Sequence, residues 1–116
     1  MSGYGDIAMT LAADVVALAI RAKIKITSAE SCTGGMISAA LTDIAGSSAM
    51  FEQGFVTYSN AVKTKMLGVS EETLQVHGAV SEPVACEMAS GALMVSGADI
   101  AVSVSEIGRA SCRERV

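Results

Sequence analysis

Aromatic and basic side chains are both scarce in this chain. It has no Trp, two Phe and two Tyr, and its 8 Lys and Arg residues are outnumbered by 12 Asp and Glu, which gives a net charge of −4. Proteins that bind nucleic acids need a basic surface and rings on which bases can stack. We therefore expect no nucleic-acid partner.

Long apolar runs and an N-terminal basic cluster are also missing. No stretch approaches the roughly 18 uninterrupted apolar residues of a membrane-spanning helix. Asp6 stands where a signal peptide would carry basic residues. These features predict a cytoplasmic protein with no membrane partner.

Cysteine and histidine are too few and too scattered to predict a metal centre. Cys32, Cys86 and Cys112 are widely spaced and lack the paired spacing of a zinc or redox site, so we expect reduced thiols. The only histidine, His77, lies in a Gln-Val-His-Gly turn, which favours the end of a helix over a place in a catalytic triad.

Apolar residues, in contrast, make up 51% of the 116 residues, enough for one domain with its own core. Helical spacing over residues 6–21 predicts a helix whose packed face comprises Ile7, Leu11, Val15, Leu18 and Ala19. Strands are predicted over 23–27, 54–58 and 100–104, and helices over 33–41, over 60–67, from 70 and over 81–97. This alternation predicts an α/β fold with helices on both faces of a mixed, mostly parallel sheet.

Residues 106–116 differ in character from the rest. This segment carries three of the eight basic residues and shows no usable periodicity. It is typical of a cloning-derived or frame-shifted end, so we expect a domain over 1–105 and leave the last eleven residues out of the fold.

The run Ala-Glu-Ser-Cys-Thr-Gly-Gly over 29–35 lies where a predicted strand gives way to a predicted helix. Hydroxyl residues followed by two glycines leave backbone amides free to face a phosphate or a developing oxyanion, although helix capping is the commoner role of such residues. Ser31, Tyr58 and Ser105 all lie at or just past the ends of predicted strands. Because such ends gather at one edge of a parallel sheet, these residues are predicted to converge.

A serine nucleophile needs a proton acceptor, and the candidates for Ser31 are Lys63, Lys65 and Glu30. A lysine accepts a proton only when it is neutral, which burial favours by lowering its pKa. A solvated surface position is nevertheless the commoner interpretation for both lysines.

The sequence leaves the roles of four further residues undecided. Cys32 is a rival nucleophile at a helix start, although a small buried cysteine is commoner. Tyr58 either orients the pair or packs half-buried at a strand end. Ser47 and Ser48 after Gly46 suit either a phosphate-binding loop or an ordinary turn.

Several blocks taken together resemble the CinA C-terminal domain family over residues 24–104. These blocks are residues 29–35, 46–48, 58–60 with Lys63, 67–69 and 77–81, in matching order and spacing. The resemblance implies a three-layer α/β/α sandwich and an amidohydrolase that converts nicotinamide mononucleotide to nicotinate mononucleotide and ammonia. It also implies a small-molecule nucleotide as partner, no metal or other cofactor, and a homo-oligomer.

Site residues carried over from the resemblance are Ser31 as nucleophile, Lys63 as general base and Tyr58 as a supporting hydroxyl, with substrate contacts from Thr33, Gly34, Gly35, Ser48 and Ser105. The family continues with Thr and a Gly/Pro-rich substrate loop, whereas this chain has Ser105 and then Glu106. This departure implies a domain that is incomplete at its C-terminal end. The alternatives are an inactive fragment of the enzyme, or a non-catalytic nucleotide-binding or assembly module.

Overall fold

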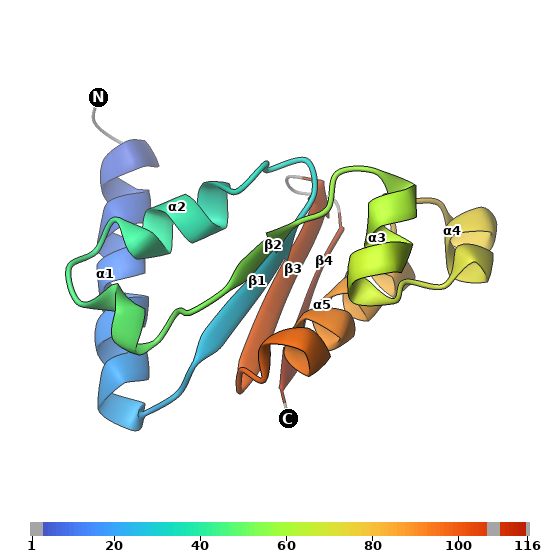
Figure 1. Ribbon diagram of the computed structural model, residues 1–116. Coiled ribbons are helices and arrows are strands. Elements are labelled where there is room, and N and C mark those ends of the chain that lie inside the picture. Colours follow the sequence, from blue (N-terminus) through green and yellow to red (C-terminus); the bar gives the residue numbers. More distant parts are fainter. Residues whose placement is uncertain (1–3, 107–109, 116) are drawn as a thin grey trace.

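A four-stranded mixed sheet forms the centre of the computed structural model, which describes residues 4–106 and 110–115 (Figure 1). The strand order is β2 (Gly54–Val56), β1 (Ile26–Glu30), β3 (Ile100–Glu106) and β4 (Ala110–Arg115). β1 pairs in parallel with both neighbours, and β4 runs antiparallel to β3. The predicted mixed, mostly parallel sheet is confirmed.

Helices cover both faces of this sheet, as Figure 1 shows. On one side lie α1 (Tyr4–Ala22), α2 (Met36–Thr42) and the 3-10 helix η1 (Ser47–Ala49); on the other lie α3 (Asn60–Leu67), α4 (Glu71–His77) and α5 (Glu82–Ser96). Two apolar clusters fill the layers, one between α1, α2 and η1 and the other between α5, α3 and the sheet. The three-layer α/β/α architecture is confirmed.

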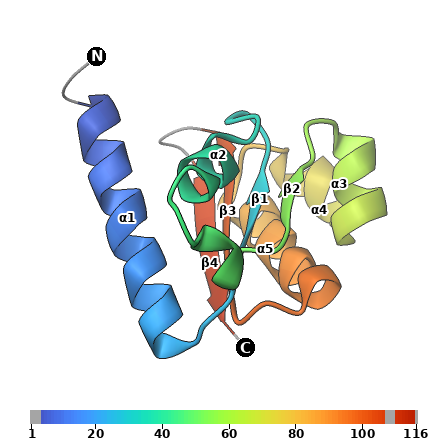
Figure 2. The same cartoon turned by 60° about the vertical axis from the view of Figure 1, so that its left-hand side comes forward.

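Of the predicted packed face of α1, Ala19 is buried, but Ile7, Leu11, Val15 and Leu18 are exposed. Ala12, Val16 and Ala19 are buried against α2 and η1, whereas Ile7 and Leu11 are 58% and 59% exposed. Figure 2 shows α1 standing beside the sheet rather than lying across it. Small side chains let α1 approach α2 closely, and because α1 is apolar on more than one side, periodicity alone selected the wrong stripe.

Several helices begin and end close to the residues that the sequence predicts. The Ser59, Ser70 and Ser81 hydroxyls accept hydrogen bonds from the N–H groups of Val62, Thr73 and Val84, which caps α3, α4 and α5. α4 ends at His77 and Gly78 follows, as expected. α2, in contrast, begins at Met36 rather than at Thr33, and β1 begins at Ile26 rather than at residue 23.

The exclusion of residues 106–116 from the fold was wrong for Glu106, which ends β3, and for residues 110–115, which form β4. Residues 107–109 and 116 lie outside the described part. β4 places Cys112 beside Cys86 of α5, with 5.0 Å between their Cα atoms, and the two are joined by a disulfide. The expectation of reduced thiols was therefore wrong for this pair, because only the antiparallel return of β4 along α5 brings them together. Cys32 is a free thiol, as expected.

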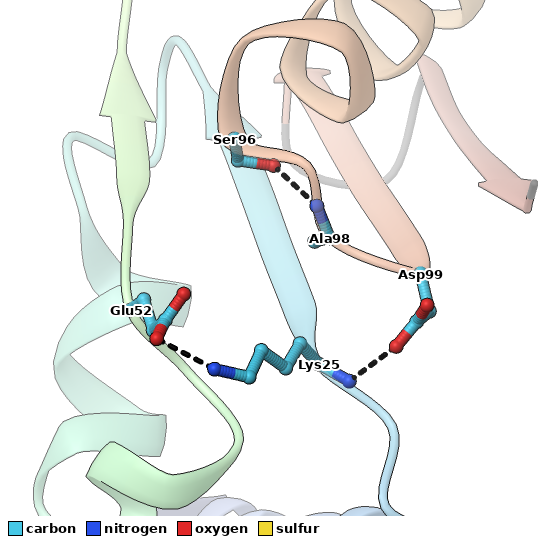
Figure 3. A network of polar contacts seen from close by, with 5 residues as sticks. All are labelled: Lys25, Glu52, Ser96, Ala98 and Asp99. Carbon is cyan, nitrogen blue, oxygen red and sulfur yellow. Dashed lines mark hydrogen bonds and ion pairs between the residues drawn. The ribbon is translucent and has the colours of Figure 1, made fainter.

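Polar contacts gather where the amino ends of the strands meet (Figure 3). Lys25 Nζ lies 2.6 Å from Glu52 Oε2, the Lys25 N–H donates to Asp99 Oδ2 at 2.9 Å, and Ser96 Oγ accepts from the Ala98 N–H at 3.1 Å. The ion pair is about half exposed, so it contributes at most about 1 kcal/mol. These contacts join the segments that lead into β1, β2 and β3, and the opposite edge of the sheet holds the candidate site.

No described helix is both long enough and apolar enough to cross a membrane.

Gly91 of α5 lies against the end of α3, where only a glycine fits. A Cβ built on Gly91 would lie 1.9 Å from the Leu67 carbonyl oxygen at the end of α3. We expect Gly91→Ala to lower the free energy of unfolding by about 1–3 kcal/mol through overpacking, measured by urea unfolding. Ser90→Ala, at an exposed neighbouring position, is the control and should leave stability unchanged or slightly raised. Equal midpoints for the two variants would contradict the packing argument.

Candidate active site

Side chains at the end of β1 point alternately to the two faces of the sheet. Ser28 and Glu30 point toward α2, where both contact Ser38, while Ala29 packs in the cluster with α5. Successive residues of a strand alternate between faces, and Ser31 follows Ala29 onto the α3 and α5 side. Its N–H donates to the Val104 carbonyl at 3.0 Å, which fixes its backbone to β3.

Lys63 meets Ser31 on that side of the sheet. Its Nζ lies 3.0 Å from Ser31 Oγ, 2.9 Å from the Thr57 carbonyl oxygen and 3.0 Å from the Tyr58 carbonyl oxygen. Lys63 is in the first turn of α3, and helical side chains lean toward the N-terminus of their helix. The side chain therefore reaches back to the segment that leaves β2, and it is only 1% exposed.

This environment suits a neutral amine. An ammonium has three N–H donors for the three oxygens, whereas a neutral amine uses two for the carbonyls and offers its lone pair to the Ser31 O–H. Burial lowers the pKa of Lys63, and the opposing electrostatic effect of Cys32 is smaller. Among the described residues the only ion pair is Lys25 with Glu52. The surface interpretation is thus wrong for Lys63 and confirmed for Lys65, which is exposed.

Glu30 is not placed to be the base. Its carboxylate is fully buried on the α2 side, where Oε1 accepts from Thr33 Oγ1 at 2.7 Å and the Ile37 N–H at 2.9 Å. Oε2 accepts from the Ser38 N–H and hydroxyl, both at 3.0 Å. Burial alone raises the pKa of Glu30, but these donors outweigh it, and the pKa lies below its ordinary value. Glu30 is an ionised structural carboxylate.

The loop over 31–35 presents amides as well as the serine. Gly34 and Gly35 have φ of 61° and 106°, the left-handed region that glycine tolerates. The N–H groups of Ser31, Cys32 and Gly34 are bonded to the carbonyls of Val104, Ser105 and Ser31, so the expectation of free amides fails for these three. Within the described part of the chain, the Thr33 and Gly35 N–H groups have no backbone partner, and these two remain available to an oxyanion.

Ser31 does not cap α2, so the capping interpretation was wrong. Gly35 occupies the N-cap position without a side-chain bond, and the Glu30 carboxylate accepts from the second and third N–H groups of the helix instead.

The remaining predicted site residues do not all lie beside Ser31 and Lys63. Tyr58 contributes its carbonyl to Lys63, but the residue is 73% exposed, so the half-buried packing interpretation was wrong. Cys32 is exposed, contrary to the buried interpretation. Ser105 is 3% exposed beside the loop, where its carbonyl accepts from the Cys32 N–H at 3.3 Å. Ser48 is exposed in η1, beyond the C-terminal end of α2, whereas Ser31 precedes the N-terminal end.

Backbone carbonyls were the part of the site that residue types did not reveal. Thr57 and Tyr58 hold Lys63 through main-chain oxygens, for which any residue type would serve. The described residues contain no group of three His, Cys, Asp or Glu that could hold a metal ion.

Comparison with protein families matches residues 8–113 to the CinA C-terminal domain. The chain belongs to this family. The resemblance predicted from the sequence blocks is thereby confirmed, and the match extends past residue 105 into β4.

Individual CinA-family relatives agree in fold and sequence. The chain is 66% identical over 82 residues to the nicotinamide-nucleotide amidohydrolase PncC of Escherichia coli K12, covering 71% of this chain and 50% of that protein. It is 52% identical over 104 residues to a CinA-like protein of Chlorobaculum tepidum, covering 90% of this chain and 25% of that protein. The chain therefore spans half the length of its PncC relative and a quarter of the length of the CinA-like protein.

Among solved structures, the competence/damage inducible protein CihA of Agrobacterium tumefaciens superposes with a TM-score of 0.84 at 48% identity, covering 89% of this chain and 62% of that one. The competence damage-inducible protein A of Klebsiella pneumoniae gives 0.84 at 37% identity, covering 94% and 81%. These structures share the α/β architecture described above.

Lys63 makes a pH-dependent contribution to stability. Its pKa in the folded chain lies below the ordinary value of 10.5, so between these two values the unfolded chain binds more protons and stability rises with pH. Relative to Lys63→Met, the unaltered chain should gain stability as pH rises through this window, by at most about 1.4 kcal/mol per pH unit. Urea unfolding of both proteins from pH 7 to 10 measures the difference, and a difference that is constant or falls with pH would contradict a buried amine with a lowered pKa.

Proposed function

We propose that this CinA-type domain belongs to an amidohydrolase that hydrolyses the carboxamide of nicotinamide mononucleotide, giving nicotinate mononucleotide and ammonia. The observation that carries the proposal is the contact between Ser31 Oγ and the buried Nζ of Lys63 at 3.0 Å. The amidohydrolase name of PncC relatives at 66–67% identity supports the choice of substrate.

In the first half of the proposed reaction, neutral Lys63 accepts the Ser31 proton as Oγ attacks the carboxamide carbon. The carbonyl oxygen becomes an oxyanion, which accepts from the Thr33 and Gly35 N–H groups. Collapse of this intermediate breaks the carbon–nitrogen bond while the Lys63 ammonium returns its proton to the leaving nitrogen. Ammonia departs, and the nicotinoyl group remains as an ester on Ser31.

The second half uses the same groups in reverse. Water enters where ammonia left and gives a proton to Lys63 as its oxygen attacks the ester carbon. The new intermediate releases Ser31 Oγ, which recovers the proton from Lys63, and the product leaves as a carboxylic acid that ionises. The carbonyls of Thr57 and Tyr58 keep Nζ in place throughout.

Several finer assignments belong to this proposal. Tyr58 as a supporting hydroxyl is one of them, and the others are the substrate contacts that the resemblance assigns to Thr33, Gly34, Gly35, Ser48 and Ser105. A cytoplasmic location, the absence of nucleic-acid and membrane partners and a homo-oligomeric state stay predictions.

Substitution of the two reacting residues tests the proposal. We expect Ser31→Ala and Lys63→Met each to lower ammonia release from nicotinamide mononucleotide by at least about 1,000-fold, because each removes one partner of a unit. Cys32→Ala removes the neighbouring thiol and should retain turnover, which separates the serine from the rival nucleophile. Circular dichroism establishes that each variant is folded. Turnover retained by Ser31→Ala would reject the hydrolase. Saturable nucleotide binding with no turnover in a full-length protein would favour a binding module instead.

The pH profile tests the role of Lys63 separately. Because the base must be neutral, kcat/KM should rise with pH and level off above the Lys63 pKa, which burial places below 10.5. Initial rates of ammonia release across pH 6 to 10 give the profile. A rate that falls over this range would show that the protonated amine is the active form.

A further inference from the structure

The carboxylate of Glu30 is an unusual way to begin a helix in this protein. α3, α4 and α5 are each capped by the serine that immediately precedes them. α2 instead has Gly35 at that position with no side-chain bond, and its Ile37 and Ser38 N–H groups donate to Glu30, seven and eight residues upstream.

Such a cap is costly for a purely structural purpose. A buried charge needs several donors to replace its hydration, and Glu30 is 0% exposed with no cationic partner in the described chain. A serine cap satisfies a helix start without burying a charge. What Glu30 adds is a second connection, because Oε1 also accepts from the Thr33 hydroxyl at 2.7 Å.

This second connection closes the loop that follows Ser31. The Thr33 hydroxyl and the first turn of α2 meet on the same carboxylate oxygen, so the chain from 31 to 37 folds back on Glu30. The Ser31 and Cys32 N–H groups are tied to β3 at the start of the same loop. The orientation of the Thr33 and Gly35 N–H groups therefore depends on the Glu30 contact.

We propose that Glu30 is a positioning residue of this site. Its carboxylate holds the loop over 31–35 so that Ser31 Oγ and the free N–H groups of the loop all face the carbonyl group of the substrate. This inference rests on the proposed amidohydrolase function. Glu30 lies on the opposite face of the sheet from Lys63 and acts only through the loop, without touching substrate.

The principal test compares Glu30→Gln with Ser38→Ala. The amide of Gln replaces one acceptor oxygen by a donor, which breaks the loop contact or the helix contact. Ser38→Ala removes one of the four bonds to the carboxylate but leaves the Thr33 contact intact. We expect Glu30→Gln to lower kcat for nicotinamide mononucleotide between about 10- and 100-fold with KM changed less than about threefold, as for a misplaced reacting group. Ser38→Ala should stay within about twofold of the unaltered chain in both constants.

A second readout does not depend on the nucleotide. A small sulfonyl fluoride labels an activated serine by forming an oxygen–sulfur bond and releasing fluoride, and mass spectrometry measures the rate at Ser31. Glu30→Gln should slow labelling by the same factor as kcat, with an unchanged midpoint in pH because the proton acceptor is still Lys63. If the full-length protein is labelled at Ser31 but releases no ammonia from the nucleotide, the proposed substrate is wrong, and the labelling ratio still decides the role of Glu30.

Substitution of Thr33 keeps the proposal falsifiable if Glu30→Gln does not fold. Thr33→Val removes only the bond from the loop to Glu30, and Thr33→Ser retains the hydroxyl. We expect slower labelling in Thr33→Val and a rate near that of the unaltered chain in Thr33→Ser. A folded Glu30→Gln that labels as fast as Ser38→Ala, or a Thr33→Val that labels at the unaltered rate, would overturn the inference.

Discussion

A buried amine held by main-chain oxygens is the constraint on which the site depends. Desolvation of Lys63 disfavours its charged form, and the two carbonyls at the end of β2 provide hydrogen bonds that the neutral form can still make. Those carbonyls lie in the segment between the end of β2 at Val56 and the start of α3 at Asn60. Two of the three hydrogen bonds of Lys63 Nζ are therefore to the backbone between a strand and a helix.

Neighbouring residues at the end of the central strand β1 lie in different surroundings. β1 pairs on both sides, so its end is held by two neighbouring strands. Alternation sends Glu30 into the layer that contains α2 and Ser31 into the layer that contains α3. Glu30 and Ser31 are therefore adjacent in sequence but lie in different layers, which explains why the Glu30 carboxylate and the buried Lys63 amine do not form an ion pair.

The sequence predicted those features that depend on local chemistry. Ser70 and Ser81 marked helix starts because a hydroxyl before a helix satisfies a free N–H, and the alternation of strands and helices indicated the layers. Lys63 was identified by the family resemblance, whereas its burial arises from packing between α3 and the sheet. The stripe of α1 that packs and the pairing of β4 depend on neighbours distant in the chain, and neither Val16 nor Cys112 carried a local signal of its partner.

Ser31 and Lys63 are 32 residues apart in the chain. They meet only after β1 and β2 have paired in parallel around α2 and η1, a crossover whose loop-closure entropy is lost before its contacts form. During refolding, reactivity at Ser31 therefore arises with the completion of this crossover and not with helix formation. The contact between Ser31 and Lys63 is in this sense an internal reporter on one non-local folding step.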